Sequence, residues 1–302
     1  MARRQLIAFY AVALLLAIAA MAIGVAADAE ALLGGLVRYL EETAQYPNVI
    51  SIGRFALAQQ PAALAIFLFA AAPTLAAIIV TTCSRSLSAR ALFARLRPIG
   101  EKRYGSSARQ CYGWLSAAYL GGIALYLAIP AFFSPAETLS PALASARGPL
   151  LLLLAWFAVA PFLDEGGLLE ELGWRGFALP LLQQLMATPL RAAVVLGCLW
   201  WAWHLPRELP ALLGGIELSS FLALQGLFLL LCVAETITCV VAVNACGGSI
   251  IPAIIIHGGS NVWSKALGAP VYELLGFDLR TLLMVLAAGL LLLRFGPSLG
   301  RR

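Results

Sequence analysis

Long runs of apolar residues, separated by short polar stretches, extend along most of this 302-residue sequence. A helix needs ~20 apolar residues to cross the hydrocarbon core of a bilayer, and several runs approach or exceed that length. The clearest runs are 6–27, 61–80, 111–133, 189–206, 221–244, 249–264 and 279–295, and a shorter one, 150–163, leads into acidic residues. The pattern predicts an all-α polytopic integral membrane protein, with eight or nine transmembrane helices in a single bundle.

The composition agrees with that prediction. Of the residues, 62% are hydrophobic and only 12% are charged, whereas soluble domains carry about 25% charged residues. The first run follows Arg3 and Arg4 and exceeds the roughly 7–15 apolar residues at the centre of a signal peptide. We therefore expect a retained first span, although residues 26–29 resemble a signal cleavage site and a cleaved signal is the alternative.

Basic residues are concentrated in the loop 81–110, which holds seven of them and one acid. The preceding loop, 28–60, has two basic residues and four acids. This asymmetry follows the positive-inside rule and predicts that the N-terminus and the 81–110 loop are cytoplasmic. We expect the loop to contact anionic lipid head groups rather than nucleic acid. Arginines near the C-terminus favour a cytoplasmic C-terminus, whereas a nine-span count would place it outside.

Three pairs of polar or aromatic residues interrupt the apolar runs with the same spacing, i and i+4. They are Glu171 and Arg175, Trp200 and His204, and His257 and Asn261. This spacing places both members of a pair on one face of a helix. Polar and charged groups are costly in a bilayer, so the pairs indicate a functional site. We therefore expect an intramembrane polar cavity inside the bundle.

The acidic segment allows two interpretations. Glu171 and Arg175 can neutralise each other, whereas Glu170 lies about 100° round the helix without such a partner. An unpaired carboxylate can act as a general base. In the alternative, all three residues lie in a solvated cytoplasmic loop, because Asp164 and Glu165 nearby look solvent-exposed.

The two histidines also allow more than one role. His204 closely follows three tryptophans, which are typical of an aromatic belt at the membrane surface. His257 lies within an apolar run and shares a helix face with Asn261, so the two can donate hydrogen bonds to a developing oxyanion. An interhelical hydrogen bond is the alternative for that pair. The role of Glu235, an acid inside another run, stays open.

The six cysteines have no CxxC spacing, and most lie within apolar runs. We expect free thiols that pack as small hydrophobic groups. They are Cys83, Cys111, Cys198, Cys232, Cys239 and Cys246.

The order and spacing of the three motifs resemble the CPBP family, which comprises CAAX-prenyl-protease-like and bacteriocin-processing (Abi) membrane proteins. The segments that are similar to this family are Glu-Glu-Leu-Gly-Trp-Arg-Gly from Glu170, Trp-His-Leu-Pro around His204, and the run ending at His257. Trp200 departs from the family, which usually has Phe there. The resemblance implies a catalytic core at 145–265, with scaffold spans at 1–144 and a final span and tail at 266–302, all in one membrane domain.

The resemblance implies a glutamate-dependent intramembrane endopeptidase. Glu170, assisted by His204, would activate a water; His257 and Asn261 would stabilise the oxyanion; Glu171 and Arg175 would order the site, and Trp200 would form an aromatic wall. No metal cofactor is implied, although Glu and His also bind Zn²⁺ and the sequence has no HExxH motif. The expected substrate is a peptide or membrane protein, with or without a lipid, in a bacterial cytoplasmic membrane. A non-proteolytic immunity, scaffold or transport protein that keeps the motifs for structure is the alternative.

A shared water requires Glu170 and His204 to lie near the same membrane face. We therefore expect 167–186 to form a helix that starts at the cytoplasmic side, with 189–206 returning to that side. The alternative joins 150–186 into one helix bent at Pro161.

Overall fold

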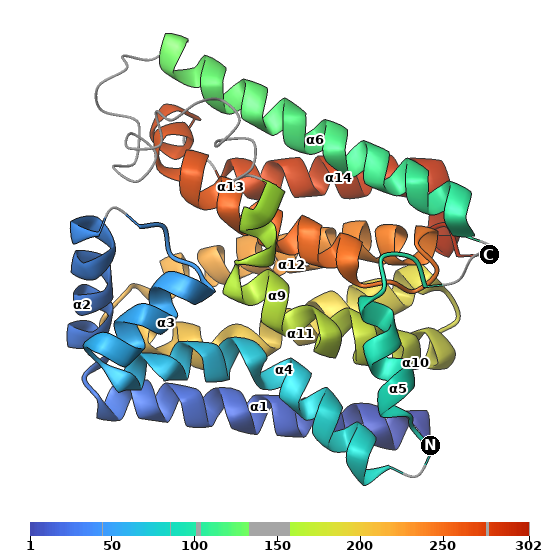
Figure 1. The fold of residues 1–302 in the computed structure, drawn as a ribbon, viewed down its shortest axis with the longest axis horizontal. Helices are drawn as coiled ribbons and strands as arrows, with labels where there is room; N and C mark the ends of the chain where they lie inside the picture. Colours follow the sequence, from blue (N-terminus) through green and yellow to red (C-terminus); the bar gives the residue numbers. More distant parts are fainter. Residues whose placement is uncertain (44, 85, 101–103, 133–157, 276–277, 302) are drawn as a thin grey trace.

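The computed structural model describes all residues except 44, 85, 101–103, 133–157, 276–277 and 302 (Figure 1). Over the described residues the fold is all-helical, as expected. The long helices are α1 (Ala2–Ala26), α4 (Leu64–Cys83), α6 (Gly105–Phe132), α11 (Pro189–Leu213), α12 (Leu218–Ala245), α13 (Ile251–Leu275) and α14 (Leu279–Phe295). The boundary between 144 and 145, and residues 150–157 of the shorter apolar run, lie outside the described residues.

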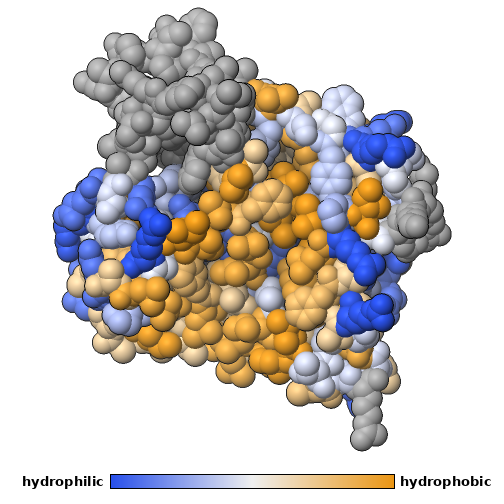
Figure 2. All heavy atoms as spheres, viewed as in Figure 1, coloured by the Kyte–Doolittle hydropathy of each residue, from blue (hydrophilic) through white to orange (hydrophobic). Residues whose placement is uncertain are grey.

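Four helical segments are long and apolar enough to cross a membrane by length and composition. Among the described residues they are Ala2–Ala26, Pro61–Cys83, Leu218–Ala245 and Leu279–Ser298. Figure 2 shows a broad apolar surface across the middle of one face, with hydrophilic residues gathered toward its two ends. These features identify an integral membrane protein.

The segment 28–60, interpreted above as a loop, contains two short helices. Asp28 caps α2 (Ala29–Glu42), and Asn48 caps α3 (Val49–Ala58) through side-chain oxygens that accept backbone N–H groups. Their apolar residues form a small core of their own with the start of α4. Its buried members are Leu32, Leu36, Ile52, Phe55, Ala56 and Ala63. The loop interpretation was wrong. The segment has no apolar run of membrane length, but its shorter apolar stretches form α2 and α3.

The acidic motif lies on a helix, so the solvated-loop alternative was wrong. Helix α9 (Glu165–Glu171), a π-helical segment (Leu172–Ala178) and α10 (Leu179–Leu185) follow one another without a break. The Asp164 side chain caps the start by accepting the N–H of Gly167 at 2.8 Å. Pro161 lies just before this helix, in the 3-10 turn Ala160–Phe162.

This helix starts at the end of the bundle opposite to the N-terminus, so its start and the N-terminus do not share one side of the membrane, as both were expected to do (Figure 1). Just before it, the carbonyl of Leu163 accepts the N–H of Val49 in α3 at 2.9 Å. It ends where Arg301 donates to the carbonyl of Gln183 at 3.2 Å, close to the C-terminus. Both termini and α5 (Ala89–Phe93), in the basic loop, lie at that same end of the bundle, and α2 and α3 lie at the other (Figure 1). We call these the termini end and the α2–α3 end.

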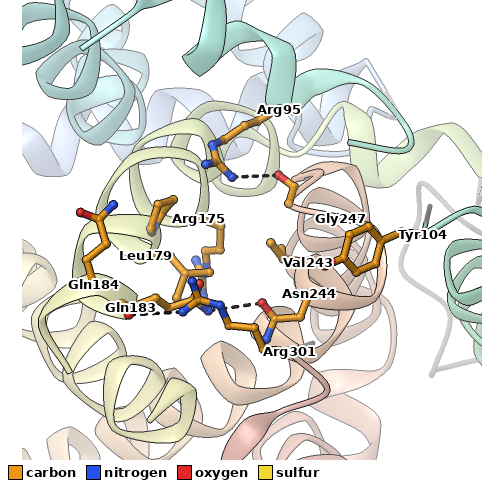
Figure 3. Close-up of a pocket in the computed structure, with 12 residues that line it drawn as sticks. Arg95, Tyr104, Arg175, Leu179, Gln183, Gln184, Val243, Asn244, Gly247 and Arg301 are labelled. Atoms are coloured by element: carbon orange, nitrogen blue, oxygen red, sulfur yellow. Dashed lines mark hydrogen bonds between the residues drawn. The ribbon is translucent and has the colours of Figure 1, made fainter. Parts of the chain in front are cut away.

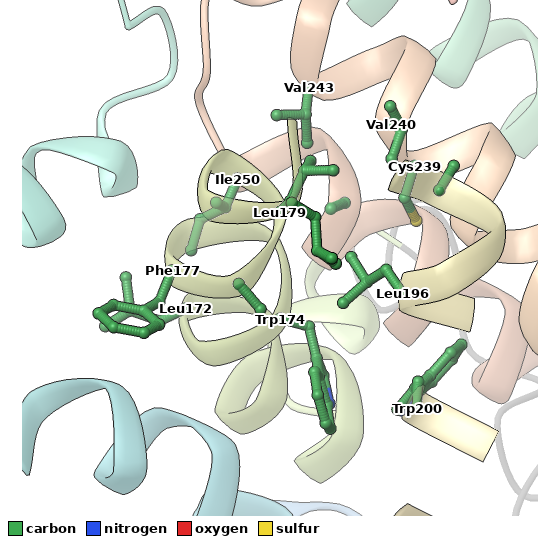
Figure 4. Packing of buried hydrophobic residues seen from close by; sticks show 14 of the residues in the cluster. Leu172, Trp174, Phe177, Leu179, Leu196, Trp200, Cys239, Val240, Val243 and Ile250 are labelled. Carbon is green, nitrogen blue, oxygen red and sulfur yellow. The ribbon is translucent and has the colours of Figure 1, made fainter. Parts of the chain in front are cut away.

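The middle of the acidic-motif helix is tightly packed. All seven residues of the π-helical segment are buried, and a π-helical turn inside an α-helix often marks a functional site. Gly173 packs against the backbone of Pro73 in α4 so closely that any side chain there would overlap it. Leu172, Trp174 and Phe177 extend from this segment into the surrounding apolar core (Figure 4).

Candidate active site

All five ionisable side chains of the three motifs are buried. Glu170, Glu171, Arg175, His204 and His257 are each between 0% and 4% exposed. Burying a charged group costs its hydration, and this cost is offset only by ion pairs or hydrogen bonds. Five such groups close together therefore indicate paired charges or a functional site.

The spacing of Glu171 and Arg175 correctly predicted an ion pair. Arg175 Nη1 donates to Glu171 Oε1 at 2.7 Å, and Arg175 Nη2 donates to Thr236 Oγ1 at 3.0 Å. The same carboxylate oxygen lies 2.8 Å from Nδ1 of His257. Glu171 therefore joins two of the motifs, and it orients the His257 ring as well as Arg175.

Glu170 has a different partner. The indole N–H of Trp200 donates to Glu170 Oε2 at 2.7 Å. Within the described part of the chain, Glu170 forms no ion pair. Its carboxylate is therefore held by a neutral donor, the indole N–H of Trp200.

The aromatic-belt interpretation of the tryptophans near His204 was wrong for two of them. Trp200 and Trp203 are buried, and only Trp201 is partly exposed. Nδ1 of His204 lies 2.9 Å from the carbonyl oxygen of Trp200. Because a carbonyl only accepts, Nδ1 carries the proton, and in the neutral ring Nε2 holds the free lone pair.

His257 and Asn261 converge on the start of α9. A side-chain carbon built on Gly166 would lie 3.1 Å from both His257 Nε2 and Asn261 Nδ2. Asn261 Nδ2 donates to Asp164 Oδ1 at 2.8 Å. Asp164 is only 1% exposed and orients the amide, so its interpretation as solvent-exposed was wrong. The signal in the sequence that could have indicated a buried N-cap is an aspartate at 164 shortly before Gly166 and Gly167.

Glu235 has a cationic partner on a distant helix. Its carboxylate accepts Arg280 Nη2 at 2.9 Å and Ser260 Oγ at 3.2 Å. An i+4 search could not find this pair, because Arg280 lies on α14 and Glu235 on α12.

One pocket brings the predicted site residues together. It has a volume of about 480 Å³ and includes Glu170, Trp200, His204, His257 and Asn261 in its wall. Most of the remaining wall is apolar and comes from the last turns of α1, from α2 and α3, and from the start of α4. The four predicted catalytic residues thus lie on three helices around one cavity, although their roles stay predictions.

Among the described residues, no group of three or more His, Cys, Asp or Glu side chains could hold a metal ion. The six cysteines are free, and Cys232, Cys239 and Cys246 are buried.

The segment with the three motifs matches a known family. Residues 146–263 match the model described as type II CAAX prenyl endopeptidase Rce1-like. This part of the chain, which is less than half of its length, is similar to that family. The match includes every residue from Glu170 to Asn261 discussed above, so the predicted family is confirmed. No protein of curated function matches the chain.

A second pocket lies at the termini end of the Rce1-like segment (Figure 3). It has a volume of about 320 Å³, and Arg95, Gln183, Asn244 and Arg301 contribute polar groups to its wall. Arg175 also borders it, while its guanidinium pairs with Glu171. The predicted catalytic residues border only the first pocket.

The indole N–H of Trp200 donates a hydrogen bond to Glu170, which a phenylalanine at this position could not do. We expect Trp200→Phe to lower kcat by about 10- to 100-fold, because a hydrogen bond to a charged group contributes about 1.5–3 kcal/mol. KM should change little, since the indole N–H contacts the Glu170 carboxylate. Steady-state cleavage of a fluorogenic peptide measures both constants.

Trp201→Phe is the matched control for that variant. It removes an indole N–H that donates to Gln225 at 3.1 Å, outside the pocket with Glu170. We expect wild-type kcat from it. Equal kcat values in the two variants would contradict the positioning role of Trp200.

Proposed function

We propose that the chain is an intramembrane endopeptidase in which Glu170 and His204 activate water without a metal ion. The observation that carries the proposal is the pocket shared by Glu170, His204, His257 and Asn261. The family match supports a protease of the CAAX type over the same residues.

Hydrolysis would begin with a water held between Glu170 and Nε2 of His204. Glu170 accepts a proton from that water, and the oxygen attacks the carbonyl carbon of the scissile bond. The same carboxylic acid then returns the proton to the leaving nitrogen as the C–N bond breaks. The indole N–H of Trp200 orients the carboxylate during both transfers.

The oxyanion would form near Gly166. Nε2 of His257 and the second N–H of Asn261 are placed to donate to it, and each such donor typically contributes ~2.7–4 kcal/mol. His257 donates from Nε2 only as an imidazolium when Nδ1 also carries a proton, and Glu171 lies where it balances that charge. Glycine at 166 leaves the space that a reacting carbonyl needs.

The substrate would be a peptide or a segment of a membrane protein, with or without a lipid. The apolar wall of the pocket, which includes Leu32, Leu36, Ile52 and Phe69, favours an apolar chain near the scissile bond. Surrounding membrane lipids are further partners of such a bundle.

We favour eight spans over nine, around an intramembrane polar cavity that corresponds to the 480 Å³ pocket. Both termini lie at one end of the bundle, which requires an even number of crossings (Figure 1). This count removes the conflict with the C-terminal arginines.

The proposal is tested by incubating the purified protein with a peptide library and identifying products by mass spectrometry. We expect cleavage by the wild type with and without a chelator, and about 10²–10⁴-fold slower cleavage by His204→Ala. Activity lost with chelator and restored by Zn²⁺ would overturn metal independence. Cleavage equal in wild type and His204→Ala would overturn the assigned site, and no cleavage of any peptide would favour the non-proteolytic alternative.

A further inference from the structure

The second pocket has a wall in which basic side chains are not balanced by acidic ones. Three arginines border it, Arg95, Arg175 and Arg301, and none of the other described residues in its wall is an aspartate or a glutamate. Glu171 neutralises Arg175. Among the described residues, neither Arg95 nor Arg301 forms an ion pair. The pocket therefore presents positive charge without a described counter-charge.

Segments that are far apart in the sequence build this wall. They are the 3-10 turn Ala94–Leu96 of the basic loop with Arg95, α10 with Gln183, the end of α12 with Asn244, and the chain after the 3-10 turn Gly296–Ser298 with Arg301. Figure 3 shows the side chains from these segments around one cavity. No spacing within a single helix could have indicated the site.

Backbone carbonyls hold both arginines in place and leave most of their donors unused. Arg95 Nη1 donates to the carbonyl of Gly248 at 3.2 Å, and Arg301 Nη1 donates to the carbonyl of Gln183 at 3.2 Å. A guanidinium has five N–H donors, and an amide NH₂ has two. The amide of Gln183 uses one of its own on Asn244 Oδ1, at 3.3 Å. The wall thus combines fixed positive charge with further N–H donors, which is the chemistry that binds an oxyanion.

Arg175 adds a buried donor at the same wall. Its side chain is 0% exposed, and its two terminal nitrogens donate to Glu171 and Thr236. Its Nε donates to no acceptor among the described residues. A buried donor without an acceptor is costly, and a bound anion beside it would lower that cost.

The size and charge of the pocket select a phosphate group. Its volume of about 320 Å³ is at the low end of the ~300–1,000 Å³ of ligand pockets, which suits a small polar group. A phosphate monoester carries about −1.5 to −2 charges at pH 7 and three acceptor oxygens. It therefore matches two guanidinium groups better than a carboxylate, which carries one charge.

We propose that the second pocket binds a terminal phosphate group between the guanidinium groups of Arg95 and Arg301. The amides of Gln183 and Asn244 border the same space and donate to its remaining oxygens. The group belongs either to the head group of an anionic phospholipid, since basic pockets between membrane helices attract such lipids, or to a soluble phosphate compound. The predicted catalytic residues do not border this pocket, so the proposal does not rest on the protease function.

Thermal unfolding of the purified full chain in detergent tests the proposal. Inorganic phosphate is titrated against chloride at equal ionic strength, and short-chain phosphatidic acid against phosphatidylcholine of the same chain length. A ligand that binds only the folded state raises Tm as its concentration rises. We expect phosphatidic acid, inorganic phosphate or both to raise the Tm of the wild type. Arg301→Gln should need about 10- to 100-fold more of the same probe for an equal rise, because it loses a charge-assisted hydrogen bond.

Arg191→Gln is the matched control, because it removes the same charge at an exposed position outside the pocket. It should respond as the wild type does. Arg95→Gln should also lose the rise; a merely structural role of Arg95 would lower Tm without the probe but keep the rise. A rise with phosphatidic acid alone identifies a lipid head group, and a rise with inorganic phosphate identifies soluble phosphate. No rise in the wild type with either probe, or equal rises in Arg95→Gln, Arg301→Gln and Arg191→Gln, would overturn the proposal.

Discussion

Glu170→Gln is expected to abolish peptide cleavage, lowering kcat by about 10²–10⁴-fold, because the amide cannot take the proton of the attacking water. Glutamine keeps the size of the side chain and an oxygen that can accept the N–H of Trp200. Folding should therefore be preserved. Single-turnover cleavage of a fluorogenic peptide in detergent measures the loss directly, and thermal unfolding of the same sample shows that the bundle is intact.

Glu42→Gln is the matched control for this change. Glu42 is exposed at the end of α2 and does not border the pocket, so we expect wild-type kcat from it. If Glu170→Gln cleaved the peptide at the rate of Glu42→Gln, the general base would have to be another group.

Arg175→Met should have the largest effect on stability, lowering the free energy of unfolding by about 3–5 kcal/mol, because it leaves the buried carboxylate of Glu171 without its arginine partner. Arg175 is fully buried and also donates to Thr236, so both contacts are lost together. Reversible unfolding in mixed detergent micelles measures the change. Arg191→Met, at an exposed position in the first turn of α11, should change the free energy of unfolding little.

A double variant separates stability from catalysis. Glu171→Leu combined with Arg175→Met removes both buried charges, and we expect it to recover most of the lost stability. Activity should stay low, since Nδ1 of His257 loses the carboxylate that orients its ring. If the double variant cleaved peptide at the wild-type rate, Glu171 would have no role in positioning His257.

The arrangement also explains why so many polar groups are tolerated inside an apolar bundle. Two buried carboxylates at or near the site have ionisable partners: Glu171 has Arg175 on the same continuous helix and His257 on α13, and Glu235 has Arg280 on α14. Such pairing offsets part of the desolvation cost and leaves Glu170 as the carboxylate with a neutral donor.

Much of the site could be predicted from local spacing. An i, i+4 separation places two side chains on one helix face whatever the rest of the fold does. The Glu171–Arg175 ion pair followed from this rule, and so did the shared face of His257 and Asn261. Apolar runs of membrane length likewise predicted the long helices, because burying backbone polar groups in lipid leaves few other structures.

Contacts between helices could not be predicted in this way. His257 and Glu171 are 86 residues apart, Asn261 and Asp164 are 97 apart, and Trp200 and Glu170 are 30 apart. Which of these groups meet depends on how the helices pack against one another. The spacing of residues within a single sequence does not contain that packing.

The sequence by itself determined the membrane class, the polar pairs within each helix and the basic loop, because these depend on hydrophobicity, local geometry and charge. Only the tertiary structure decided the direction of the helix with Glu170, the burial of Asp164 and the end at which the pocket lies. The physical reason is that a helix has the same apolar pattern whichever way it crosses the bundle. Its direction is determined by the packing of its ends, here Leu163 against α3 and Gln183 against Arg301.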